Sequence, residues 1–125
     1  MLRARILLKG FTPSAALKDV YCDAMVSFCT SKRESTHIAS AEALCCGCAV
    51  VIPARPSLSL PQWYTTKDSG TVTKEDTPES LADAVLAELR EWQSGHRNPA
   101  AIAAAWQPFF HADKVMAHIF APRAE

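Results

Sequence analysis

The sequence lacks an excess of charge of either sign. Its 125 residues include 13 Lys and Arg and 13 Asp and Glu, so the formal net charge at pH 7 is zero. Proteins that bind nucleic acid generally carry a basic patch or a clear excess of positive charge. The balance therefore argues against a general nucleic-acid binder, and we expect no nucleic acid among the partners.

A long apolar run is also missing. The N-terminal stretch RARILLKGF, residues 3–11, carries Arg3 and Arg5, but its apolar part is too short for a signal peptide or a spanning helix. We therefore expect a cytoplasmic protein. Peripheral membrane contact stays open as an alternative.

The cysteines do not form the pattern of a disulfide framework. They are five in number, and Cys45, Cys46 and Cys48 crowd one turn. This spacing also lacks the second Cys pair or the His pair that a zinc site needs. Reduced thiols packed around a helix end are the expected state, and we predict no metal site.

What the sequence does contain is enough apolar material for a core. Hydrophobic residues make up 49% of the chain and charged residues 21%, which is typical of a folded protein and not of a disordered tail. A chain of 125 residues fits one domain and is too short for two full ones. We predict a single domain over residues 1–125.

Hydrophobic patterning predicts strands that alternate with helices. The expected strands are 3–11, 25–31, 48–54 and 70–75, and the expected helices are 12–24, 34–46, 76–92, 98–110 and 112–121, with a helical turn at 61–64. Such alternation predicts an α/β fold with a parallel sheet covered by helices. Ligands of these sheets bind beyond the carboxyl ends of the strands, which here includes the loop from Thr30 to Glu34.

Local signals predict where several helices begin and end. Thr77 is a strong N-cap candidate, and Pro78 follows at the first helical position. Gly47 stands where a helix C-terminus favours a left-handed residue. Asn98 is expected to open the next helix, and Pro108 is expected to break it.

Two glutamates, Glu34 and Glu42, lie eight positions apart in SKRESTHIASAEALCCGCAVV, residues 31–51. On a helix this spacing separates two side chains by roughly 80° around the axis and about 12 Å along it, too far to share one proton. The pair can instead hold two parts of one elongated ligand that carries hydroxyls, such as a nucleotide sugar. On spacing alone, a favourable interaction with the helix dipole is the preferred explanation of Glu34, whereas Glu42 in an apolar helix needs solvent or a partner.

Free backbone amides are expected between the two glutamates. If a helix begins just after Glu34, the amides of Ser35, Thr36, His37 and Ile38 point out of its N-terminus, where they form a phosphate site. The pattern therefore predicts a phosphate flanked by hydroxyl-bearing sugar groups.

This segment resembles the donor-binding segment of retaining glycosyltransferases of the GT-B fold, especially glycosyltransferase family 4. The family pattern reads roughly S-x-x-E-G-F-G-x-x-x-x-E-A-x-x-x-G-x-P-V-V, and the matching residues are Ser31, Glu34, Glu42, Ala43, Gly47, Val50 and Val51. Weaker similarity extends over residues 5–119. The resemblance implies a partial Rossmann-like parallel sheet flanked by helices, the later half of a GT-B C-terminal domain.

The resemblance also implies a role for each residue of the motif. Glu42 would hold the ribose hydroxyls of the nucleotide, and Glu34 would contact the transferred sugar and support positive charge near its anomeric centre. The amides of Thr36, His37 and Ile38 would contact the diphosphate. The implied reaction transfers a sugar from a nucleotide diphosphate sugar to a glycan, lipid or small-molecule acceptor with retention, without a metal or another cofactor.

The sequence departs from the family pattern in two places. The G-F-G of the family is Ser35-Thr36-His37 here, so side chains stand where glycine lets the backbone approach phosphate. His37 either donates to the phosphate or lies half exposed at the start of a helix. The usual proline before the apolar strand is Ala49.

The basic pair and the acceptor domain of GT-B enzymes would precede this chain. We therefore expect an incomplete domain that is inactive as an isolated chain. An incomplete parallel sheet has an open edge, which favours self-association or pairing with a missing N-terminal domain.

Two other functions fit the same residues. One is a non-catalytic α/β module that binds nucleotide sugars or a protein, with weak or no nucleotide affinity. The other is a related GT-B enzyme, such as a nucleotide-sugar epimerase, that uses similar donor contacts without an acceptor sugar. Nothing in the sequence identifies the sugar, the base or the acceptor.

Overall fold

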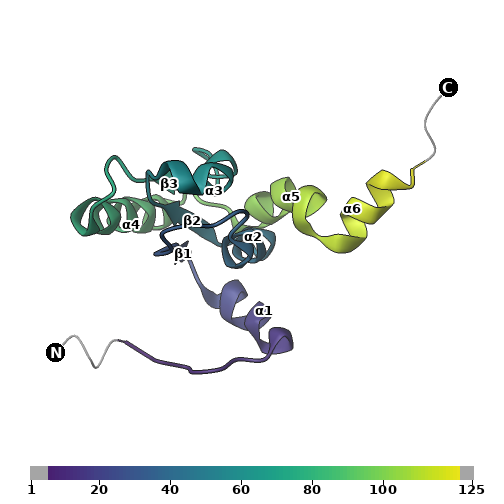
Figure 1. Ribbon diagram of the computed structural model, residues 1–125. Coiled ribbons are helices and arrows are strands. Elements are labelled where there is room, and N and C mark those ends of the chain that lie inside the picture. The colour runs from purple at the N-terminus through teal and green to yellow at the C-terminus, as the bar shows by residue number, and fades with distance from the viewer. Residues whose placement is uncertain (1–5, 122–125) are drawn as a thin grey trace.

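Residues 6–121 are described by a computed structural model, in which helices alternate with three short strands (Figure 1). The strands are β1 (Val26–Phe28), β2 (Ala49–Ile52) and β3 (Gly70–Val72). The helices are α1 (Ser14–Asp23), α2 (Ile38–Cys45), α3 (Ser59–Trp63), α4 (Pro78–Gln93), α5 (Pro99–Phe110) and α6 (Ala112–Ile119), and the 3-10 turn η2 (Pro56–Leu58) precedes α3.

The three strands form one parallel sheet in the order β1-β2-β3. Val26 of β1 pairs with Ala49 of β2, and Val50 of β2 pairs with Gly70 of β3. All residues of β2 are buried, as expected for the central strand of a sheet that is covered on both faces. The prediction of an α/β fold, with a partial Rossmann-like parallel sheet flanked by helices, is therefore confirmed.

The core lies where α2 and α5 pack together beside the sheet. Its largest members are Leu44, Val50, Ile52, Leu58, Tyr64, Ile102 and Trp106. The rings of Tyr64 and Trp106 meet edge to face with centroids 6.3 Å apart, a favoured aromatic arrangement. The side-chain Nε2 of Gln107 donates to the carbonyl of Cys45 at 3.0 Å, so α5 also satisfies an orphan carbonyl at the end of α2.

Helix α4 begins as its sequence predicts. The side-chain oxygen of Thr77 accepts a hydrogen bond from the amide of Ser80 at 3.2 Å, and Pro78 is the first helical residue. Its inward face also contains Glu88, which is fully buried. A carboxylate on an apolar face requires a partner, because an isolated buried charge is very costly.

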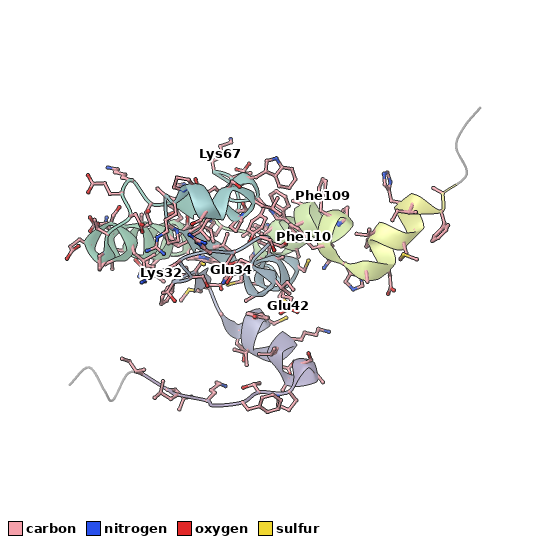
Figure 2. The ribbon with its side chains drawn as sticks, viewed as in Figure 1. Lys32, Glu34, Glu42, Lys67, Phe109 and Phe110 are labelled. Atoms are coloured by element: carbon pink, nitrogen blue, oxygen red, sulfur yellow. The ribbon has the colours of Figure 1, made fainter. Side chains whose placement is uncertain are left out.

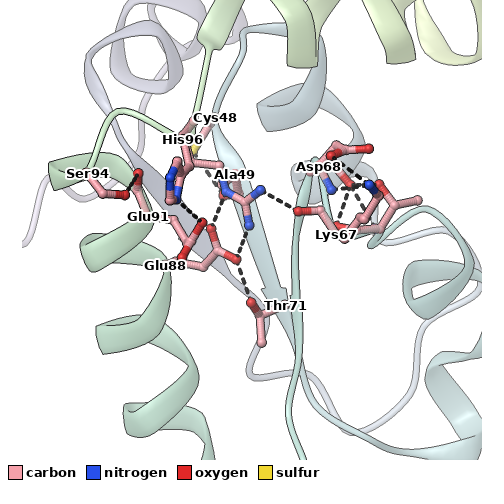
Figure 3. A network of polar contacts seen from close by, with 12 residues as sticks. Cys48, Ala49, Lys67, Asp68, Thr71, Glu88, Glu91, Ser94 and His96 are labelled. Carbon is pink, nitrogen blue, oxygen red and sulfur yellow. Dashed lines mark hydrogen bonds and ion pairs between the residues drawn. The ribbon is translucent and has the colours of Figure 1, made fainter.

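Arg97, in the connection to α5, is that partner. Its Nε and Nη2 donate to the two carboxylate oxygens of Glu88 at 2.8 and 2.6 Å (Figure 3). The hydroxyl of Thr71 donates to the same carboxylate, and Nη1 of Arg97 donates to the carbonyl of Lys67. We call these four residues the Glu88–Arg97 corner, and they join α4, β3 and the connections on either side.

Three predicted elements differ from the structure. The strand expected at 3–11 is wrong for residues 6–11, which belong to no strand and leave Leu8 89% and Phe11 94% exposed; residues 3–5 lie outside the described part. A strand needs a neighbour for its backbone groups, and this run has none among residues 6–121.

The helix predicted over 34–46 begins only at Ile38. Pro108 does not break α5, because only two residues of the helix follow it and the lost hydrogen bond falls in the last turn.

The remaining helices lie further from the sheet. Figure 1 shows α1 and α6 projecting away from the strands and the helices packed on them. Neither helix contains a buried residue. Across residues 6–121, no helix has the length and apolar character that crossing a membrane would require.

Candidate functional site

The loop from Cys29 to His37, here called the β1–α2 loop, carries most of the predicted site. It leaves the carboxyl end of β1, and the chain that leaves the neighbouring end of β2 runs beside it. Open α/β sheets bind their ligands at this edge. The β1–α2 loop therefore lies at the edge where the sequence predicts ligand binding, and the site itself stays a prediction.

His37 ends the loop in an unusual conformation. Its φ of 51° and ψ of 73° lie in the left-handed region, and among the described residues it is the only non-glycine with a positive φ. Its Nδ1 lies 2.7 Å from the hydroxyl oxygen of the buried Ser40. This left-handed residue is the reason why α2 cannot extend back to Glu34, since a right-handed helix excludes it.

Five consecutive backbone amides around His37 have no hydrogen-bond acceptor in the described part of the chain. Its carbonyl accepts from the amides of Ser40 and Ala41 at 3.0 and 3.3 Å, which are the first bonds of α2. The preceding amides have no acceptor within residues 6–121; they belong to Ser35, Thr36, His37, Ile38 and Ala39. The sequence predicted four of them, although only Ile38 and Ala39 lie within the helix. Clustered N–H groups at a helix start bind anions.

Glu42 lies in a groove beside these amides. The groove, of about 620 Å³, lies between α1, α2 and the junction of α5 with α6, and we call it the Glu42 groove. Its polar lining residues are Ser14, Lys18, Tyr21, Thr36, Glu42, Gln107 and His111. Figure 2 shows Glu42 on the side of α2 nearer to α1. An exposed carboxylate in such a groove can accept hydrogen bonds from ligand hydroxyls.

The groups around Glu42 remain protonated at neutral pH. Burial raises the pKa of the Tyr21 phenol, and the nearby carboxylate of Glu42 raises it further. Burial and Glu42 likewise raise the pKa of the Cys45 thiol, and burial together with Cys22 raises the pKa of Cys46 to about 11. The groove wall therefore presents neutral thiols and a neutral phenol around Glu42.

Glu34 is placed differently from Glu42. It is half-buried in the β1–α2 loop, and its amide donates to the carbonyl of Ser57 at 3.4 Å. In the described part of the chain, the lining of the Glu42 groove includes Thr36 and Ile38 but not Glu34. Figure 2 likewise shows Glu34 closer to the strands than Glu42. The individual roles of both glutamates and of residues 35–38 stay predictions.

Several residues of the groove have no signal in the sequence that points to them. Lys18 and Tyr21 belong to α1, whereas Gln107 and His111 belong to α5 and to the residue after it. No local motif links them to the glutamates, since packing across 62 positions brings Gln107 to Cys45. Nor does any group of three or more His, Cys, Asp or Glu residues between positions 6 and 121 have a geometry that could hold a metal ion.

Comparison with known proteins adds one family match. Residues 1–91 match the family described as glycosyl transferases group 1, which covers most of the chain. Comparison with curated proteins gives no match.

Proposed function

We propose that this chain, which belongs to the glycosyl transferases group 1 family, supplies the donor-binding segment of a glycosyltransferase. Family membership supports glycosyl transfer in general. The finer proposal is a family 4 type of GT-B enzyme that uses a nucleotide diphosphate sugar and retains the anomeric configuration. The acceptor is a glycan, a lipid or a small molecule.

The free amides of residues 35–39 carry this proposal. They have no acceptor within residues 6–121, and Thr36 and Ile38 also line the groove that contains Glu42, so a diphosphate at the amides and a ribose in the groove would be neighbours. We assign the diphosphate to these amides and the ribose hydroxyls to Glu42. The amides supply hydrogen bonds to phosphate without a metal ion, and we expect that EDTA leaves nucleotide affinity unchanged.

Glu34 is assigned to the transferred sugar. It lies in the β1–α2 loop outside the lining of the Glu42 groove, directly before the free amides of residues 35–39, so we expect phosphates bound at these amides to bring the sugar near this carboxylate. A carboxylate there can accept from sugar hydroxyls and support positive charge at the anomeric centre.

Calorimetry with UDP and GDP tests the nucleotide site. Glu42→Gln should lower the affinity for the more tightly bound of the two nucleotides about tenfold, because a charged acceptor for the ribose is lost. The 2′-deoxy nucleotide should already bind weakly to the wild type and should lose little more in Glu42→Gln. Glu79→Gln, which changes an exposed glutamate at the start of α4, is the matched control. Equal affinities of wild type and Glu42→Gln would remove Glu42 from the site.

A non-catalytic nucleotide-sugar-binding module is the second candidate. It is favoured by the half-buried position of Glu34 outside the groove lining. If Glu34 contacts the sugar, Glu34→Gln should lower the affinity for the preferred UDP-sugar or GDP-sugar and leave the affinity for UDP or GDP unchanged. If Glu34 does not contact the sugar, as the second candidate assumes, the variant should change neither affinity.

Transfer itself is expected to need a second domain. GT-B enzymes, which the sequence resembles, place the reaction between two Rossmann-like domains, and residues 6–121 contain one sheet. We therefore expect the isolated chain to bind the donor without transferring its sugar. Transfer by the purified chain alone would contradict this part of the proposal.

A further inference from the structure

The connection from β2 to β3, residues 53–69, holds the beginning of the β1–α2 loop. Nη1 of Arg55 donates to the carbonyl of Ser31 at 2.8 Å. The hydroxyl of Ser57 donates to the carbonyl of Lys32 at 2.6 Å. These bonds fix the loop where it leaves the sheet, but they do not reach the free amides.

Tyr64, further along the same connection, holds the other end of the loop. Its hydroxyl lies 2.8 Å from the carbonyl oxygen of Thr36 and 3.4 Å from that of His37. Burial raises the pKa of this phenol, so the hydroxyl keeps its proton and donates. The ring is fully buried and packs edge to face on Trp106 and Phe110, which fixes the position of the donor.

The conformation held by Tyr64 carries an energetic cost. A left-handed φ of 51° is unfavourable for a residue with a side chain, so the surroundings must maintain it at His37. Tyr64 contacts the carbonyl side of this turn, and Ser40 contacts the imidazole. If His37 relaxed, the peptide groups on both sides would rotate, and the amides of His37 and Ile38 would change direction.

We propose, building on the proposed function, that Tyr64 is a positioning residue for the phosphate end of the donor. Its hydroxyl keeps His37 left-handed and so fixes the direction of the amides of His37 and Ile38, which the proposed function assigns to the diphosphate. It does not line the Glu42 groove as the structure describes it, so it acts through the backbone of the loop.

Tyr64→Phe tests this role, because it removes the hydroxyl and keeps the ring. The probes are UDP or GDP, whichever binds the wild type more tightly, and the matching nucleoside without phosphate. Nucleotide affinity should fall about tenfold, as expected for one lost hydrogen bond, while nucleoside affinity stays unchanged. Equal losses for both probes, or no loss for either, would overturn the proposal.

A glycine at position 37 provides the second readout. Glycine adopts a positive φ without the steric penalty, so His37→Gly should make the loop depend less on Tyr64. The loss of nucleotide affinity caused by Tyr64→Phe should therefore be several-fold smaller in the His37→Gly background. The same loss in both backgrounds would show that Tyr64 does not act through the conformation of His37.

Ser40→Ala replaces Tyr64→Phe if the latter does not fold. It removes the other bond that holds His37, and it should also weaken the nucleotide more than the nucleoside. An equal effect on both probes overturns the proposal. If wild type binds neither nucleotide, the proposed function and this role both fail. Normal wild-type binding with an unchanged Tyr64→Phe removes only the role of Tyr64.

Discussion

The Glu88–Arg97 corner and the β1–α2 loop treat their polar groups in opposite ways. In the corner, a fully buried carboxylate accepts from two guanidinium nitrogens and a hydroxyl, and the guanidinium also reaches a carbonyl. In the loop, five consecutive amides point to no acceptor within the described residues. Both regions flank the same short sheet, the corner beside β3 and the loop after β1.

The difference separates a structural network from the proposed binding site. A charge that water cannot reach must be paired within the chain, because leaving it alone costs several kcal/mol. Exposed N–H groups can bind water until a ligand replaces it, so they need no internal partner. Substitutions in the corner should therefore change stability, whereas substitutions at the amides should change binding.

The largest effect is expected from Arg97→Met. The side chain of Arg97 is 6% exposed and that of Glu88 is 0% exposed, so the variant leaves a buried carboxylate without its partner. The free energy of unfolding should fall by about 3–5 kcal/mol, measured by urea denaturation. The double variant Glu88→Leu with Arg97→Met should lose clearly less. If Arg97→Met were as stable as the double variant, the carboxylate of Glu88 would have to reach solvent or another partner.

Gly47→Ala should have the next largest effect. Gly47 follows α2 with a φ of +86°, and a Cβ there would lie 2.5 Å from the carbonyl oxygen of Pro99. The left-handed strain and the clash with α5 should together cost about 2–4 kcal/mol of unfolding free energy. Gly95→Ala is the matched control, because its φ is +78° and a Cβ there meets nothing within 4 Å. Equal losses of unfolding free energy in Gly47→Ala and Gly95→Ala would mean that α5 moves away from the added Cβ at no cost.

The smallest effect is expected as a difference in stability between His37→Ala and His37→Gly. His37→Ala and His37→Gly both lose the contact with Ser40, so they differ in the cost of the left-handed conformation. The glycine variant should be more stable by about 1 kcal/mol, although glycine is usually the weaker residue near a helix. Urea denaturation measures the difference. An alanine variant that is equally stable would show that position 37 is not strained.

Local sequence signals predicted the elements that depend on neighbours in the chain. Thr77 and Pro78 start α4 because a cap and a fixed φ act within one turn. Gly47 ends α2 for the same kind of reason. The apolar stretch at Val50 lies in the central strand, as its uninterrupted hydrophobicity indicates.

Features that depend on distant residues could not be predicted in this way. The start of α2 depends on His37, whose backbone is held by Tyr64 across 27 positions. Glu88 interrupts an apolar helix face, which signals a buried partner, but only the fold identifies it as Arg97. The motif predicted Glu42 as a site residue, whereas only packing places Lys18 and His111 in the same groove.

The apolar run ahead of α1 is a candidate site of self-association in concentrated solution. Ile6, Leu7 and Leu8 are 63%, 77% and 89% exposed, and this short stretch has no place in the sheet. Apolar segments of this kind, free of secondary structure, pair readily with their copies. We therefore expect a charge placed among them to raise solubility without disturbing either the corner or the amides.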